Sequence, residues 1–226
     1  PWVQVTEIAA IAVDGDTGEV IDTFHRKIKL TPETKAEIRR QQGAAKPESQ
    51  PGARDADSGA VEGPRALSHQ QLFKMTRYGD KNAPYLEIKQ VYQEWVDWLS
   101  QFDQTIIIGQ NAGFDMAHMF APLSKLGIRK PKLGEVMDTM TMARAWIYPL
   151  LKAGVEAGDE ESKEMITKFD VPDKYRGGVR QSFTLGNLGK AFDVPAEHWH
   201  SGISDAKQTY GIFKKMIEFL KRAQEA

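Results

Sequence analysis

The sequence predicts an α/β fold, a mixed sheet flanked by helices, on three observations. The segment Val5 to Asp14 is a short apolar run with β-branched members, and residues 20–30 alternate apolar and polar side chains, so both are expected to be strands. Residues 84–102 repeat their apolar side chains at helical spacing. Beyond them, apolar runs of strand length alternate with helix-like segments, which is typical of a sheet covered by helices.

Composition limits the function classes that fit. The chain has 226 residues and a hydrophobic content of 41%, enough to bury one sizeable core, so we expect a single globular domain. A formal net charge of -1 excludes a global field that draws the protein onto nucleic acid or membrane, so a polyanionic partner must be held by local groups. The absence of cysteine excludes disulfide frameworks and thiolate metal sites. With no signal peptide and no apolar run near the ~18 residues of a membrane span, a cytoplasmic protein without a membrane partner is expected.

The stretch AVDGDTGEV, residues 12–20, joins the first two strands and carries two acids one residue apart, Asp14 and Asp16. Such a pair could be half of a metal site. It could equally belong to a tight hairpin turn, because Asp and Gly supply the positive φ angles that these turns need. The local sequence leaves both interpretations open.

The segment after the second strand is predicted to begin with a helix. Thr31 and Pro32 have the character of an N-cap and a first-turn proline, which starts a short helix through about Arg40. Residues 43–66 are rich in Gly, Pro, Ala, Ser and charge and lack apolar periodicity, which predicts a flexible loop insertion. A loop of this length is either functional or a tolerated insertion.

The second half of the chain is predicted to continue as strands and helices. TIIIGQN, residues 105–111, is expected to be a strand buried on both faces. The helix after it should close at Gly127, with a kink or an early stop at Pro122. The further elements expected are a strand and helix around Asp138-Thr139, an irregular segment over 153–181, a short helix capped by Ser182 or Thr184, and a last helix from near Ser204.

Two acids are expected at helix starts, where ligands of α/β proteins bind. Asp115, in NAGFD, follows the end of a buried strand, and the helix N-terminus adds partial positive charge beside it. Asp205, in HWHSGISDAKQ, lies in the first turn of the last helix with Ser204 as its cap. For each acid taken by itself, stabilisation of the helix start is a sufficient explanation. His200, on the loop before Asp205, favours chemistry, because an imidazole beside a metal-binding acid can take a proton from water; sequence position does not separate it from His198.

These motifs, in this order, resemble the DnaQ-like 3′-to-5′ exonucleases, the DEDDh group of the ribonuclease H-like superfamily. NAGFD matches the motif N-x-x-F-D, and HSGISD matches H-x4-D about 90 residues later. VMDT with its following helix, and then SFTLGNLGKAFDV, resemble the strand and the helix before the last motif. TEIAAIAVD looks like the second strand of the family. The resemblance extends from Thr6 to about Leu220.

The resemblance decides how the first acid pair is interpreted. In the family, four acids hold two divalent cations, and the first two come as Asp-x-Glu on the first strand. Using Asp14 and Asp16 for this motif would leave one strand before Thr31, where the family needs two, so we interpret the stretch as a hairpin turn. The resemblance therefore implies a ribonuclease H-like mixed sheet whose first strand is missing from this sequence. Because that strand is central and pairs with both neighbours, an upstream segment is expected to supply it.

By the same resemblance the protein would hydrolyse phosphodiester bonds at the 3′ ends of single-stranded nucleic acid, with two Mg²⁺ or Mn²⁺ ions. Asp115 and Asp205 would be metal ligands, and His200 the general base. DNA is the favoured substrate, although the sequence does not distinguish it from RNA. A homodimer and a polymerase partner are both compatible with the family.

Residues near the motifs are candidates for binding nucleic acid. They are Asn111 and Phe114, which flank Asp115, and Lys174, Tyr175, Arg176 and Arg180 in DKYRGGVRQ, where the tyrosine could stack on a base. A core position for Phe114 and a merely solvated basic loop are the structural alternatives. A catalytically inactive nucleic-acid-binding or scaffold protein with the same fold is the competing function, because two acids of four would hold a cation loosely. A phosphatase or another small-molecule hydrolase is a third.

Overall fold

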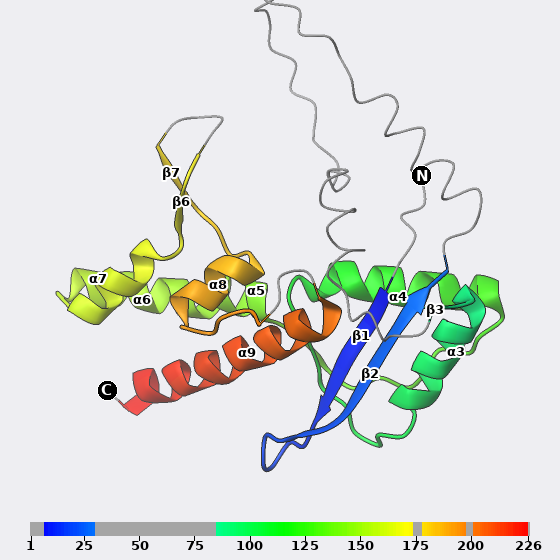
Figure 1. Ribbon diagram of the computed structural model, residues 1–226. Helices are drawn as coiled ribbons and strands as arrows, with labels where there is room; N and C mark the ends of the chain where they lie inside the picture. The colour runs from blue at the N-terminus through cyan, green and yellow to red at the C-terminus, as the bar shows by residue number, and fades with distance from the viewer. Residues whose placement is uncertain (1–6, 30–84, 174–177, 198–200, 226) are drawn as a thin grey trace, which may run out of the picture.

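The computed structural model describes residues 7–29, 85–173, 178–197 and 201–225 (Figure 1). The first half contains β1 (Glu7–Val13), β2 (Val20–Ile28), β3 (Tyr85–Leu86), α3 (Ile88–Leu99), β4 (Ile107–Gly109), α4 (Ala112–Leu126) and β5 (Val136–Asp138). The second half contains α5 (Thr139–Met142), the π-helix η1 (Ala143–Ile147), α6 (Tyr148–Glu156), α7 (Glu160–Thr167), β6 (Asp170–Pro172), β7 (Val179–Gln181), α8 (Leu185–Ala191) and α9 (Gly202–Glu225). The helix expected from Thr31 to Arg40 and the loop expected at 43–66 lie outside the described residues.

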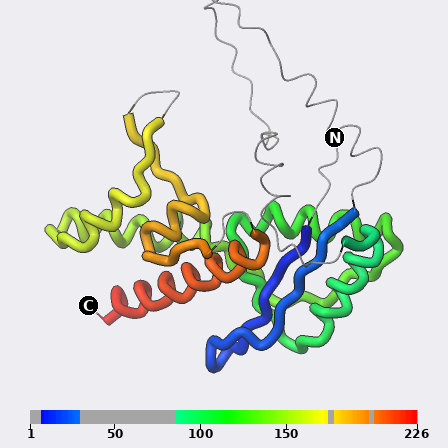
Figure 2. The backbone as a smooth tube through the Cα atoms, viewed as in Figure 1, coloured from blue at the N-terminus to red at the C-terminus, as the bar shows by residue number. Residues whose placement is uncertain are grey.

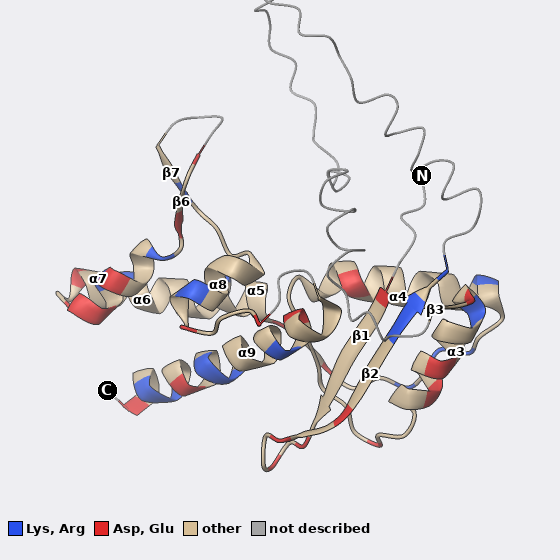
Figure 3. Ribbon diagram, viewed as in Figure 1, with Lys and Arg blue, Asp and Glu red and all other residues tan. Residues whose placement is uncertain are grey.

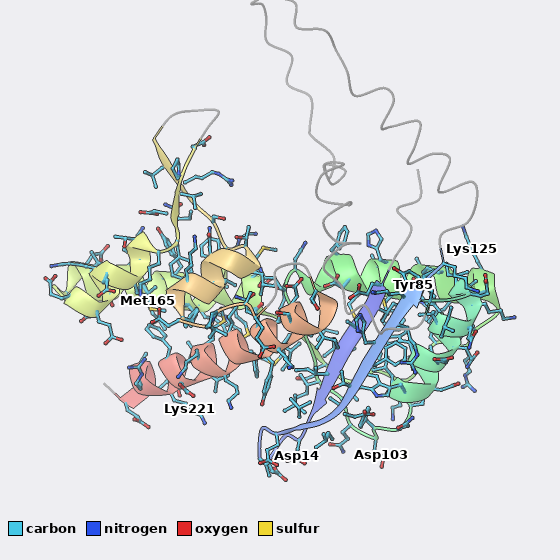
Figure 4. The ribbon with its side chains drawn as sticks, in the orientation of Figure 1. Asp14, Tyr85, Asp103, Lys125, Met165 and Lys221 are labelled. Carbon is cyan, nitrogen blue, oxygen red and sulfur yellow. The ribbon has the colours of Figure 1, made fainter. Side chains whose placement is uncertain are left out.

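The first two strands form the predicted hairpin, with β1 and β2 antiparallel from Glu7↔Lys27 onward. At the tip, labelled in Figure 4, Asp14 Oδ1 accepts hydrogen bonds from the backbone N–H groups of Thr17, at 2.8 Å, and Asp16, at 3.1 Å. The hydrogen bonds from Thr17 lower the pKa of Asp14. The hairpin-turn interpretation is therefore confirmed: this carboxylate closes its own turn.

The described strands lie in three small sheets rather than in one. β3 adds to β2 in parallel, β4 pairs in parallel with β5, and β6 pairs antiparallel with β7. The α/β class is confirmed, but the described residues do not form a single mixed sheet. The expectation that residues 105–111 are buried on both faces is wrong, since β4 is only half-buried and Ile106 keeps 59% of its surface exposed. The physical reason is that, among the described strands, β4 pairs with β5 alone.

Two apolar clusters hold the molecule together. The first lies between the β1–β2 hairpin and the helices α3 and α4, and it contains the apolar stripe predicted for α3. The second lies among α5, η1, α6, α7, α8 and the middle of α9. In Figures 1 and 2, α9 begins beside β1 and runs away from it toward the second cluster, where Ile212 and Met216 are fully buried. One helix thus connects the two halves.

The irregular segment expected at 153–181 is instead α7 and the β6–β7 hairpin, so that prediction is wrong. Asp159 caps α7, because its carboxylate accepts the N–H of Ser162 at 2.9 Å. One face of the segment is buried through Met165 and Phe169. The charged composition of this stretch suggested a loop, whereas α7 is an amphipathic helix. Its apolar face packs in the second cluster against residues far away in the sequence.

Pro122 does not stop α4, which continues to Leu126 and closes, as predicted, at Gly127 with φ 69°. A proline has no N–H to donate to the carbonyl four residues earlier, here that of His118. The Tyr92 hydroxyl, from α3, donates to this carbonyl at 3.0 Å. A long-range hydrogen bond therefore replaces the missing helical one, which is why the expected early stop is not observed.

Candidate functional site

The candidate site begins where the parallel strands β4 and β5 end side by side. A Cβ atom on Gly109 would lie 2.9 Å from the Cβ of Ala112, so only glycine allows the chain to turn from the strand into α4. Asn111 adopts the left-handed conformation, φ 60° and ψ 47°, and precedes the first helical residue. The sharp turn places the first turn of α4 at the carboxyl end of the sheet, where ligands of α/β proteins bind.

Asp115 lies in this first turn. The residue is exposed to solvent, yet the protein atoms packed around its carboxyl are enough that desolvation raises its pKa. The charge of His118 opposes this shift, and the charge of Asp138 adds to it. A carboxylate that is desolvated beside a second carboxylate gains more from a nearby cation than an ordinary surface acid does.

Asp138, at the end of β5, was not among the residues predicted for the site. Its Oδ1 accepts the N–H of Asn111 at 2.9 Å and that of Met140 at 3.0 Å, and its Oδ2 accepts the Thr141 hydroxyl at 3.0 Å. The residue therefore caps α5 and fixes the turn that carries Asp115. The sequence did contain a signal for Asp138, because it ends the strand that follows NAGFD. Neighbouring parallel strands end at the same edge of a sheet, so this acid could have been expected near Asp115.

A second set of hydrogen bonds fixes the same turn. The fully buried Thr139 hydroxyl lies 2.6 Å from the Gln110 side-chain oxygen, and the Gln110 amide donates to the Phe183 carbonyl at 2.7 Å. Phe183 directly precedes Thr184, the N-cap of α8, which is one of the two caps predicted for that helix. The β4 end is thereby joined to the chain that leads into α8.

Asp205 lies in the first turn of α9 and is half-buried. Its backbone N–H donates to the Ser201 carbonyl at 2.8 Å, and its carbonyl accepts the Thr209 hydroxyl at 2.8 Å. The prediction that Ser204 caps this helix is wrong, because α9 already begins at Gly202. Both helices that carry candidate acids, α4 and α9, pack against β4.

The other predicted residues fall into two groups. Phe114 keeps 48% of its surface exposed, with its ring centroid 4.1 Å from that of His118, so it is not a core residue. Arg180 lies on β7 and is exposed. The predicted residues outside the described part of the chain are Lys174, Tyr175, Arg176, His198 and His200. Within the part that is described, no group of three His, Cys, Asp or Glu side chains is placed to hold a metal ion.

A cavity of about 390 Å³ lies between α9 and the β1–β2 hairpin, and neither Asp115 nor Asp205 lines it. Its lining includes Lys207, Tyr210 and Lys214 of α9. Figure 3 shows several Lys and Arg positions along this helix. The Lys214 ammonium lies 5.7 Å from the centre of the Tyr210 ring. This cavity is therefore separate from the acids at the end of β4.

No family model and no curated protein matches the chain. In the described ranges no helix has the length and apolar character to cross a membrane.

Proposed function

We propose that the protein is a metal-dependent 3′-to-5′ exonuclease that acts on single-stranded nucleic acid, with DNA as the favoured substrate. The observation that carries the proposal is the position of two acids at the carboxyl end of the parallel strands β4 and β5: Asp138 ends β5, and Asp115 lies in the first turn of the helix that follows β4. Desolvation and the charge of Asp138 raise the pKa of Asp115, which adds to this. Asp205 supports the proposal, since this third acid opens a helix that packs on the same strand, β4. Asp115 and Asp205 belong to the motifs that resemble the DnaQ-like family.

The donor chemistry of these residues fits Mg²⁺ or Mn²⁺. Both ions prefer hard oxygen ligands such as carboxylates. Asp115 would hold a cation at the end of β4, and Asp205 would share it. Two such ions, when bound, stabilise the attacking and leaving oxygens of a phosphoryl displacement.

The separation of the β1–β2–β3 sheet from the β4–β5 sheet suggests where the other two metal-binding acids of the family would lie. β1 and β4 belong to different sheets, yet α9 packs against both strands. A further strand between them would join β1–β2–β3 to β4–β5 and pair with the backbone groups at the edges of both. We place the Asp-x-Glu pair of the family on such a strand.

The remaining roles follow from position. His200 is the proposed general base, and its removal should lower the rate about 10²–10⁴-fold. Phe114, exposed one residue before Asp115, is available to stack on the terminal base. Arg180, exposed on β7, is available to contact phosphates together with Tyr175 and Arg176.

The test uses the purified protein and a 5′-labelled single-stranded DNA. With Mg²⁺ we expect a ladder of products shortened from the 3′ end, and EDTA should abolish it. Asp115→Asn, Asp205→Asn and His200→Ala should each remove nearly all activity. Asp103→Asn is the matched control, because Asp103 is exposed and lies, in the view of Figure 4, on the same side as Asp14 at the hairpin tip rather than at α4. No shortening by the unaltered protein, or full activity in Asp115→Asn, would refute the proposal.

The competing function is an inactive nucleic-acid-binding protein with the same fold. It is favoured by the lack of a three-residue metal cluster within the described ranges. It requires binding of the labelled strand in EDTA and no release of mononucleotides in Mg²⁺. Hydrolysis of a chromogenic phosphodiester without shortening of DNA would instead indicate a small-molecule hydrolase.

A further inference from the structure

Glu7, the first residue of β1, contacts the first residue of α9, which is 195 positions away in the sequence. Its Oε1 accepts the backbone N–H of Gly202 at 3.1 Å and lies 2.8 Å from Nε2 of His25. The Glu7 side chain is only 17% exposed, and that of His25 only 9%. The carboxylate is therefore enclosed between β2 and the start of α9.

Gly202 makes this approach possible. A Cβ atom at this position would lie 2.6 Å from the Cβ of Ala9 and 2.7 Å from Glu7 Oε1. Real Cβ atoms do not come so close to other heavy atoms, so any other residue would push α9 away from β1. The glycine and the glutamate together set the position of the helix start.

The interaction satisfies one of the first N–H groups of α9. The first N–H groups of a helix have no partner within the helix, and an acid near them is favoured by the helix dipole. Ser204, the residue expected to cap α9, lies inside the helix. The Gly202 N–H is capped by a carboxylate from a distant strand.

His25 holds the carboxylate in place. It lies on β2 directly opposite Ala9, in the register of the hairpin. Its ring nitrogen approaches the same Glu7 oxygen that accepts the Gly202 N–H. The chain of contacts from β2 through Glu7 to α9 leaves the first turn of this helix little freedom to move.

We propose that Glu7 is a positioning residue: it fixes the first turn of α9 and thereby places Asp205, three residues after Gly202, for the reaction. This inference rests on the proposed function. A displacement of a catalytic group by about 1 Å can lower a rate about 10²-fold, whereas the contacts that bind the rest of the substrate stay unchanged. Loss of Glu7 should therefore lower kcat and leave KM for DNA nearly as it was.

The test compares two substitutions of similar size. Glu7→Gln keeps a carbonyl oxygen that can accept the Gly202 N–H, so it should keep at least about half of kcat. Glu7→Met lacks this acceptor and should lose about 10–100-fold in kcat, with a higher Mg²⁺ concentration at half-maximal rate. Glu19→Met is the matched control, because Glu19 is an exposed glutamate at the other end of the same hairpin. All assays are run well below the unfolding midpoint of each variant.

Equal kcat values for Glu7→Met and the unaltered protein would overturn the proposal, as would a rise in KM with unchanged kcat. Hydrogen exchange at the Gly202 amide gives a second measurement that needs neither activity nor a variant. Slow exchange is expected, and exchange as fast as that of a free loop would also overturn the proposal. If the unaltered protein has no nuclease activity, the proposed function fails, while protection of this amide and its loss in Glu7→Met still establish the Glu7 contact.

Discussion

Replacing Tyr92 with Phe removes the hydroxyl that donates to the His118 carbonyl inside α4. Tyr92 is fully buried between α3 and α4, and Pro122 cannot supply a helical N–H to the same carbonyl. The substitution leaves the aromatic ring in place, so packing changes little. Its main effect is a partly buried carbonyl without its donor.

The expected cost is about 1–3 kcal/mol of unfolding free energy, the usual penalty for a buried polar group left unsatisfied. For a chain of this size the unfolding midpoint should fall by roughly 2–4 °C per kcal/mol. In a Pro122→Ala background the backbone N–H that the alanine introduces can donate to the His118 carbonyl. There, Tyr92→Phe should cost at least about 1 kcal/mol less, a coupling within the range found for directly interacting residues.

Urea unfolding followed by tryptophan fluorescence measures all four proteins of this cycle, since Trp95 and Trp98 lie on α3. The comparison requires equal m-values. Tyr85→Phe is the control, because Tyr85 is 54% exposed and its replacement should change the free energy by less than about 0.5 kcal/mol. If Tyr92→Phe costs the same in the Pro122→Ala background as in the unaltered protein, the reasoning is refuted.

Alkaline pH tests the same residue independently. Burial raises the pKa of Tyr92 to about 12, from an ordinary value of 10.0. Between these values the unfolded chain loses the proton first, so the unfolding free energy should fall as pH rises, by up to about 3 kcal/mol. Tyr92→Phe should remove this part of the pH dependence, and an unchanged slope would contradict the assignment.

Three further predictions concern β4, β5 and α4. Desolvation and the charge of Asp138 raise the pKa of Asp115, so above the ordinary pKa of 3.8 the ionisation of this carboxyl opposes folding. Asp115→Asn should therefore stabilise the protein at pH 7 in EDTA. Urea unfolding should show a gain in unfolding free energy that becomes smaller toward pH 3. A Cβ on Gly134 would overlap the Thr105 carbonyl, so Gly134→Ala should cost about 1–3 kcal/mol or more. A Cβ at Gly113 meets no atom within 4 Å outside its own helix, so Gly113→Ala should stabilise the protein by about 0.5–1 kcal/mol, measured in the same urea unfolding experiment.

The elements predicted correctly are those whose signals are local. The hairpin turn is held by Asp14 and its own neighbours, so a few residues of sequence contain its full explanation. The buried stripe of α3 follows from helical spacing alone. Asp115 and Asp205 were placed correctly in helix first turns for the same reason.

The features missed depend on partners far away in the sequence. α7 is stabilised by a local cap at Asp159, but its apolar face is recognisable only once Phe169 and the rest of the second cluster surround it. The continuation of α4 past Pro122 depends on Tyr92, 30 residues earlier. The division of the strands into three sheets is likewise a matter of pairing, which no single segment encodes.

The position of Asp205 depends on a hydrogen bond in one half of the molecule and on an apolar cluster in the other. The start of α9 is held by Glu7 against the β1–β2 hairpin, while Ile212 and Met216 anchor the same helix in the second cluster. A helix fixed at its start and in its middle transmits a displacement of either half to the acid in its first turn. Core substitutions at Met216, although three turns from Asp205, should therefore affect kcat as well as stability, whereas substitutions in an exposed part of α9 should affect neither.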